Sequence, residues 1–217
     1  VWLTSVIQSI THRLTDVNRF CISLHFIHER RFSASTYFTN RRRCGIIKKK
    51  SDLLEMVLNN TKETFQLLKA TSKEIIDNMK ALYPKYFSFT EKSEFEFEIR
   101  FGADLLLFSM HTNVYEFSRL HEVMKLPYIK EDKERSFSGT ISIYNFLKDS
   151  YDYNRDYDIG YLIGRMFVNK DKHYFIEGKR EVGLLYSNFN TSVVDKESVT
   201  SIILSSMEYT NNFNLLS

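Results

Sequence analysis

The segment from Ile159 to Arg180 has the densest group of residue types that could bind a ligand. Residues 169–172, Asn-Lys-Asp-Lys, have the composition of a hairpin loop between two antiparallel strands. With a four-residue loop, Val168 pairs with His173, and Gly164 pairs with Glu177 on one face. A glycine in a strand can leave space for another group, so this face is predicted to bind a ligand. The candidate ligand-binding residues are Gly160, Gly164, Arg165, His173, Glu177 and Lys179.

The two strand glycines also have a purely structural interpretation. This interpretation is the favoured one, and in it Gly160 and Gly164 allow the long helix to approach the sheet closely. They are also expected if they mark a β-bulge. Both alternatives are open from the sequence.

Glu177-Gly178-Lys179 has the carboxylate-x-lysine spacing used by metal-dependent nucleases. In such sites carboxylates hold a divalent cation, and the lysine orients or activates the attacking water. In the register above, the upstream acid Asp158 lies roughly 20 Å from Glu177, because a strand rises about 3.3 Å per residue. One cation cannot bridge that distance, although acids from other strands are alternative ligands. A divalent-metal nuclease or phosphodiesterase using Glu177 and Lys179 is therefore the second hypothesis.

Other catalytic and cofactor signatures are absent from the sequence. His111, His121 and His173 are not spaced with another ligand type in a recognised metal pattern. There is no Gly-x-Ser-x-Gly elbow for acyl transfer, and no glycine-rich phosphate loop ending in Lys-Ser or Lys-Thr. No cofactor and no metal are therefore predicted, and a non-catalytic protein is favoured over an enzyme.

Basic residues are concentrated in the first fifty positions. Residues 1–50 contain 10 Lys and Arg against two acids, whereas residues 51–217 contain 20 against 25. Arg41-Arg42-Arg43 and Lys48-Lys49-Lys50 would neutralise phosphates, so an arm that binds nucleic acid is one hypothesis. The Arg, Ser and Thr content also suits a transit peptide. The favoured interpretation is a basic N-terminal extension over residues 1–50, disordered or not native, followed by a single domain over residues 51–217.

The composition is that of a globular protein. The chain has 217 residues, of which 43% are hydrophobic and 26% are charged, as in one soluble domain. No run of residues approaches the ~20 apolar positions of a membrane-spanning helix. Cys21 and Cys44 support neither a disulfide framework nor a zinc motif, so a reducing, cytoplasmic compartment is predicted.

A long amphipathic helix is predicted directly after the basic segment. Ser51 is a suitable N-cap, and Tyr83-Pro84 ends the helix because proline excludes the preceding residue from the helical region. Between them, one stripe of residues follows in steps of four and three. This spacing favours packing on a sheet and also suits a homodimer through helix 52–82. The stripe consists of Leu54, Leu58, Thr61, Phe65, Leu68, Ser72, Ile75, Met79 and Leu82.

The rest of the domain is predicted to contain strands and one final helix. Residues 94–101 alternate polar and apolar, as in a strand with one buried face. Residues 119–136 are charged and lack periodicity, so they are predicted to be a long loop or lid. Asp195 or Ser198 is expected to cap the last helix. Further strands are predicted at 105–110, 114–117, 140–144, 159–168, 173–180 and 182–186.

These elements predict an α+β fold. It has a long N-terminal helix, a mainly antiparallel sheet of five to seven strands and a C-terminal helix, with the helices on one sheet face. We interpret the chain as a non-catalytic module that binds a small ligand or a protein partner. The expected surface is the sheet face near the hairpin and the 119–136 loop. Nucleic acid is a disfavoured partner, since residues 51–217 carry net negative charge, and no membrane contact is expected.

Overall fold

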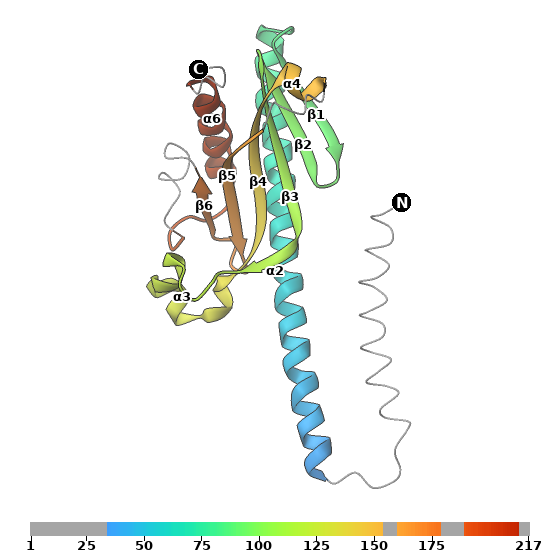
Figure 1. Ribbon diagram of the computed structural model, residues 1–217, viewed down its shortest axis with the longest axis vertical. Helices are drawn as coiled ribbons and strands as arrows, with labels where there is room; N and C mark the ends of the chain where they lie inside the picture. The colour runs from blue at the N-terminus through green and yellow to red at the C-terminus, as the bar shows by residue number, and fades with distance from the viewer. Residues whose placement is uncertain (1–33, 154–159, 179–188, 213–217) are drawn as a thin grey trace. The chain divides into compact units, whose positions relative to one another are not determined.

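The computed structural model describes residues 34–153, 160–178 and 189–212 (Figure 1). The chain divides into two compact units, Val1–Asp52 and Leu53–Ser217. Helix α2 (Ala34–Leu82) begins in the first unit and ends in the second.

The beginning of α2 differs from the prediction. Residues 34–50 are helical, and Ser51 lies inside the helix instead of capping it. Residues 41–50 are mostly Arg, Lys and Ile and contain no proline, so the helix can continue through them. The side chains of Arg43, Lys48, Lys49 and Lys50 are exposed. The rest of the predicted basic extension, residues 1–33, lies outside the described residues.

The second unit is built on an antiparallel sheet. In its described part, six strands lie in the order in which they occur along the chain, each paired with the next. Such an order needs only connections between neighbouring strands, which are the simplest that a chain can make. The strands are β1 (Phe87–Ser93), β2 (Glu96–Phe101), β3 (Asp104–Glu116), β4 (Phe137–Leu147), β5 (Tyr161–Asn169) and β6 (Tyr174–Gly178).

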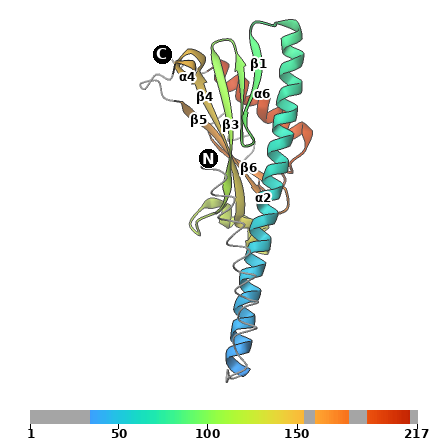
Figure 2. The ribbon, with the colours of Figure 1, turned by 90° about the vertical axis from the view of Figure 1, so that its right-hand side faces the viewer.

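Helices α2 and α6 (Lys196–Asn212) pack on one face of this sheet (Figures 1 and 2). Phe65 and Leu68 of α2 and Ile202 of α6 are buried in one hydrophobic core with Phe108 and Ile141 of the sheet. Burial of a side chain of this size contributes about 2 kcal/mol relative to its exposure. The α+β fold with its helices on one sheet face is therefore confirmed. Most of the helical stripe is used for packing on the sheet, although Leu82 at its end is 76% exposed. A homodimer through helix 52–82 stays a prediction.

Helix α2 approaches the sheet closely at Gly139 of β4. A Cβ atom at Gly139 would lie 1.9 Å from Thr61 Oγ1, so this position has no room for a side chain. Thr61 is fully buried there, and its hydroxyl donates a hydrogen bond of 2.7 Å to the carbonyl oxygen of Val57. That bond satisfies the hydroxyl within the helix, which allows a polar residue on the packed stripe.

The predicted loop at 119–136 contains three short helical turns. They are η1 (Glu122–Lys125), α3 (Pro127–Glu131) and η2 (Lys133–Ser136). Pro127 suits the first turn of α3, where its missing N–H has no helical partner to lose. The side chains of His121 and Asp132 accept hydrogen bonds at the starts of η1 and η2. Turns this short show no helical periodicity in the sequence, which explains the wrong prediction.

The 119–136 segment packs on the sheet face opposite to α2 and α6. Tyr128 and Ile129 of this segment are buried in a second, smaller cluster with Phe167 of β5. Phe167 lies between Met166 and Val168, whose side chains belong to the main core. Because successive residues of a strand point to opposite faces, the second cluster lies on the face without the two long helices. We call this the open face.

The remaining strands, the segment after β4 and the last helix show further outcomes. Strand β1 is not predicted by the sequence pattern, and the strand expected at 114–117 is the end of the longer β3. The segment after β4 forms the short helix α4 (Lys148–Asp152). Ser198 N donates a 2.7 Å hydrogen bond to Asp195 Oδ1, which confirms the predicted start of α6. The strand predicted at 182–186 lies outside the described residues.

Candidate functional site

The β5–β6 hairpin has a three-residue loop, so the predicted register is wrong by one residue. Asn169 pairs with His173 through a 3.0 Å backbone hydrogen bond, and Asn169 Oδ1 accepts from the N–H groups of Asp171 and His173. Lys172 adopts a left-handed conformation, with φ of 58°, which lets the chain turn back within three residues. Gly164 consequently pairs with Gly178, and Arg165 pairs with Glu177.

The glycines of the predicted site are explained by packing. Ile143 pairs with Gly164 and Tyr144 pairs with Leu162, so Ile163 is an extra residue and Gly164 lies at a β-bulge. At Gly160, a Cβ atom would lie 2.0 Å from the Phe146 ring. The Phe146 ring therefore fills the space beside Gly160, and Gly164 lies at a bulge, as the structural interpretation expects.

A row of polar residues crosses the open face. Its members are register partners from β2 to β6 in succession: Glu96, Ser109, Ser142, Arg165 and Glu177. Ser109 donates a 3.1 Å hydrogen bond to Glu96. Neighbouring strands lie about 4.8 Å apart, so the row is a continuous polar line across the sheet.

Arg165 is the unusual member of this row. It is half-buried, and its guanidinium has no hydrogen bond or ion pair with any residue of the described ranges, although Glu177 is its register partner. A guanidinium has five N–H donors in a fixed planar arrangement that matches a carboxylate. Leu162 directly precedes the extra residue Ile163 and is 37% exposed, and the bulge places it on the same face as Arg165. Arg165 is therefore available to bind a group from outside this part of the chain.

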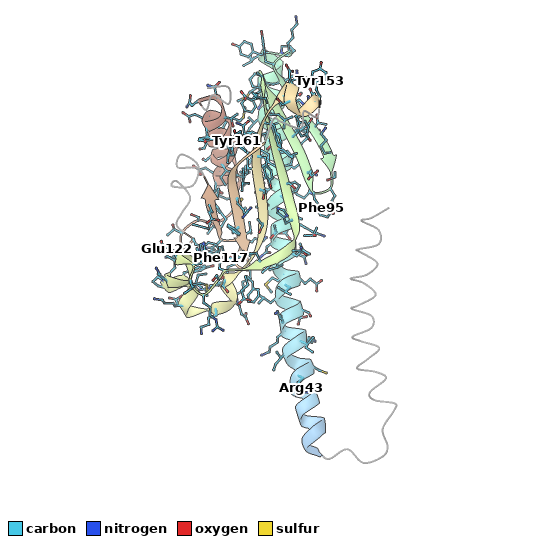
Figure 3. The ribbon with its side chains drawn as sticks, in the orientation of Figure 1. Arg43, Phe95, Phe117, Glu122, Tyr153 and Tyr161 are labelled. Carbon is cyan, nitrogen blue, oxygen red and sulfur yellow. The ribbon has the colours of Figure 1, made fainter. Side chains whose placement is uncertain are left out.

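His121 comes from the 119–136 segment and faces Glu177. His121 Nδ1 accepts a 3.2 Å hydrogen bond from Val123 N, so the proton of the neutral ring is on Nε2. Nε2 lies 3.8 Å from Glu177 Oε1, and the ring packs at 4.8 Å from that of Phe117. Figure 3 shows Phe117 and Glu122 near one end of the sheet, with Tyr161 farther along β5. The sequence did not predict His121 as a partner of Glu177, since only the fold brings the two together.

His173 has a structural environment. Its ring stacks on that of Tyr128 at 4.9 Å, and its Nδ1 lies 3.1 Å from the carbonyl oxygen of Phe189. Tyr128 donates a 3.0 Å hydrogen bond to Asp171 and accepts one of 3.0 Å from Asn169. These contacts join the hairpin loop to α3. The His173 ring is packed within them and is not free on the surface.

Arg135 strengthens the same connection. Its Nε donates to Asp171 at 2.8 Å, and its guanidinium lies 4.2 Å from the centre of the Tyr128 ring. Burial of the phenol raises the pKa of Tyr128 to about 12. On the other side of the loop, a hydrogen bond from Lys170 lowers the pKa of Asp132. We call the contacts of Tyr128, Arg135, Asn169 and Asp171 the hairpin clamp, because they fix the segment that carries His121 beside β6.

The remaining predicted chemistry has little structural support. Across the described ranges, no three His, Cys, Asp or Glu side chains come together in a way that could hold a metal ion. Lys179, the lysine of the nuclease hypothesis, lies outside the described residues. Of the predicted site, the fold thus brings Arg165 and Glu177 together and stacks His173 on Tyr128 of the hairpin clamp. It uses Gly160 for packing and places Gly164 at a bulge.

No helix in the described part of the chain is both long enough and apolar enough to cross a membrane. Comparisons of the chain with protein-family models, with curated proteins and with solved structures find no match. The function must therefore be argued from the geometry of the chain itself.

Proposed function

We propose that this chain is a non-catalytic binding module whose open face takes an acidic group of a protein partner. The observation that supports this proposal is the half-buried Arg165 without an acceptor among the described residues. A charged group that has lost part of its hydration is costly unless it is paired. A carboxylate from a partner would supply two parallel hydrogen bonds to the guanidinium.

The surroundings of Arg165 suit a protein partner. Leu162 adds exposed apolar area beside the charge, and Tyr144 is its register partner on the neighbouring strand. Tyrosine and arginine are enriched in the central parts of protein interfaces. Glu177, whose side chain is 55% exposed, adds an acceptor at the edge of the same surface, held near the Nε2 donor of His121. The surface thus has one fixed cation, one acceptor and an apolar neighbour.

The test is selection of short peptides from a random display library on the full chain. We expect the selected peptides to be enriched in Asp and Glu, and to bind Arg165→Ala at least about tenfold more weakly, since charge-assisted hydrogen bonds are lost. Arg43→Ala removes an exposed arginine of α2 and is the matched control. A selection without acidic enrichment, or equal binding by the Arg165→Ala and Arg43→Ala variants, would contradict the proposal.

A further inference from the structure

A cleft of about 470 Å³ lies beside β1 and β2, at the end of the unit where α2 stops. It is lined by the last turn of α2, the following turn, the two strands and the start of α4. The cleft uses none of the residues proposed above to bind a protein partner, Arg165, Glu177 and His121. Its volume is within the range of pockets that hold small molecules, about 300–1,000 Å³.

The charged side chains that line this cleft are predominantly cationic. Five of them are basic and one is acidic: Lys80, Lys85, Lys92, Arg100 and Lys148, against Glu98. This excess contrasts with the whole unit, where acids outnumber bases. Positive charge is therefore concentrated here by the fold and not by composition.

Two of the five cations are matched by acids. Glu98 is 1% exposed, and its carboxylate accepts a 2.9 Å hydrogen bond from Arg100 Nε and lies 3.2 Å from Lys92 Nζ. Arg100 also donates to Asp152 at 2.7 Å. The hydrogen bond from Arg100 lowers the pKa of Asp152, and the charges of Lys148 and Lys92 act in the same direction. The buried Glu98 thus orients Arg100 through a hydrogen bond and lies in an ion pair with Lys92, although its Oε2 atom accepts no hydrogen bond from the described residues.

The other three cations are unmatched. Within the described ranges, no acid lies within ion-pair distance of Lys80, Lys85 or Lys148. Three ammonium groups around one cleft repel one another, and this repulsion is relieved when an anion binds between them. Ser88 and Thr90 of β1 line the same cleft and add hydroxyl donors.

We infer that this cleft binds a small molecule that carries two or more adjacent phosphates. A diphosphate has about three negative charges near neutral pH, which matches the three unmatched lysines. Lysines hold phosphate as point charges without the planar geometry that a carboxylate and an arginine share. The adjacent phosphates belong either to a soluble diphosphate or to neighbouring phosphate monoesters of a lipid headgroup, and the two sources share this anionic chemistry.

The test is titration calorimetry of the full chain with inorganic pyrophosphate and with ADP at low salt. We expect both probes to bind the wild type, and the double variant Lys85→Ala/Lys148→Ala to bind at least tenfold more weakly. The matched control is Lys73→Ala/Lys130→Ala, which removes two exposed lysines outside the cleft and should bind as the wild type does. Arg165→Ala should also bind normally, which separates this inference from the proposed protein-binding site.

A second arm of the experiment identifies the source of the phosphates. Binding to vesicles that contain a bisphosphorylated inositol lipid, without binding to its soluble headgroup, ADP or pyrophosphate, would assign the cleft to a membrane lipid. Binding of the soluble probes assigns it to a soluble ligand. No binding in either arm, or equal binding by the cleft variant and the control variant, overturns the inference.

Discussion

The close contact between α2 and the sheet predicts the effect of Gly139→Ala. The added Cβ would lie 1.9 Å from Thr61 Oγ1, 2.7 Å from Thr61 Cβ and 2.8 Å from Thr61 Cγ2. Real Cβ contacts are essentially never shorter than 3.0 Å, so the Thr61 side chain must rotate, and the helix or the strand must also shift within a closely packed core because Thr61 Cβ itself is too near. Such overpacking costs typically 1–3 kcal/mol, and we expect the free energy of unfolding to fall by about 2 kcal/mol.

The assay is urea denaturation of the full chain, followed by far-ultraviolet circular dichroism. Gly45→Ala is the control, because Gly45 is an exposed glycine of α2 with no neighbouring atom within 4 Å of an added Cβ. Alanine is the better helix former, so this change is expected to raise stability by up to about 1 kcal/mol. The double variant Gly139→Ala/Thr61→Ala lacks two of the three contacting atoms of Thr61. Its decrease in the free energy of unfolding should be smaller than the sum of the decreases in the two single variants. An unchanged unfolding midpoint for Gly139→Ala would refute the close approach of α2 to β4.

Two further predictions concern titration and capping. Burial raises the pKa of the Tyr128 phenol in the folded chain to about 12. The protonated phenol therefore contributes fully to stability below its unfolded pKa of about 10, and this contribution is lost as pH rises toward about 12. Tyr128→Phe should reduce the decrease of the unfolding midpoint at alkaline pH. Hydrogen bonds from Ser198 lower the pKa of Asp195 in the folded chain. The Asp195 carboxylate therefore contributes to the free energy of unfolding above its ordinary pKa, and this contribution is lost as pH falls through the lowered value. Asp195→Ala should cost about 1 kcal/mol in urea denaturation at pH 7 and less in acid, whereas equal losses at both pH values would exclude a cap by the carboxylate.

Much of the fold follows from periodicity in the sequence. The polar and apolar alternation over residues 94–101 predicted strand β2, whose apolar face is buried as expected. The stripe that contains Phe65 and Leu68 predicted the helix that packs on the sheet. The start of α2 was missed, because Ser51 is an acceptable cap that the favourable preceding residues override. Strand β1 was missed because it is at the edge of the sheet, where only Phe87 and Phe89 pack on the core.

The candidate site could be predicted only in part. Arg165 and Glu177 were identified from their types, but their pairing depends on whether the hairpin loop has three or four residues. That choice is made by the Asn169 side chain and the left-handed Lys172, which local composition does not determine. His121 and the lysines of the cleft come from distant segments, so their proximity requires the three-dimensional fold.

The affinity of Arg165→Ala for peptides selected on the wild-type chain tests the proposed binding function most directly. Fluorescence anisotropy with one labelled acidic peptide, measured in parallel on wild type, Arg165→Ala and Arg43→Ala, gives the three dissociation constants. A value at least about tenfold weaker for Arg165→Ala alone is the predicted result. Equal dissociation constants for all three proteins would contradict an acidic partner at the open face.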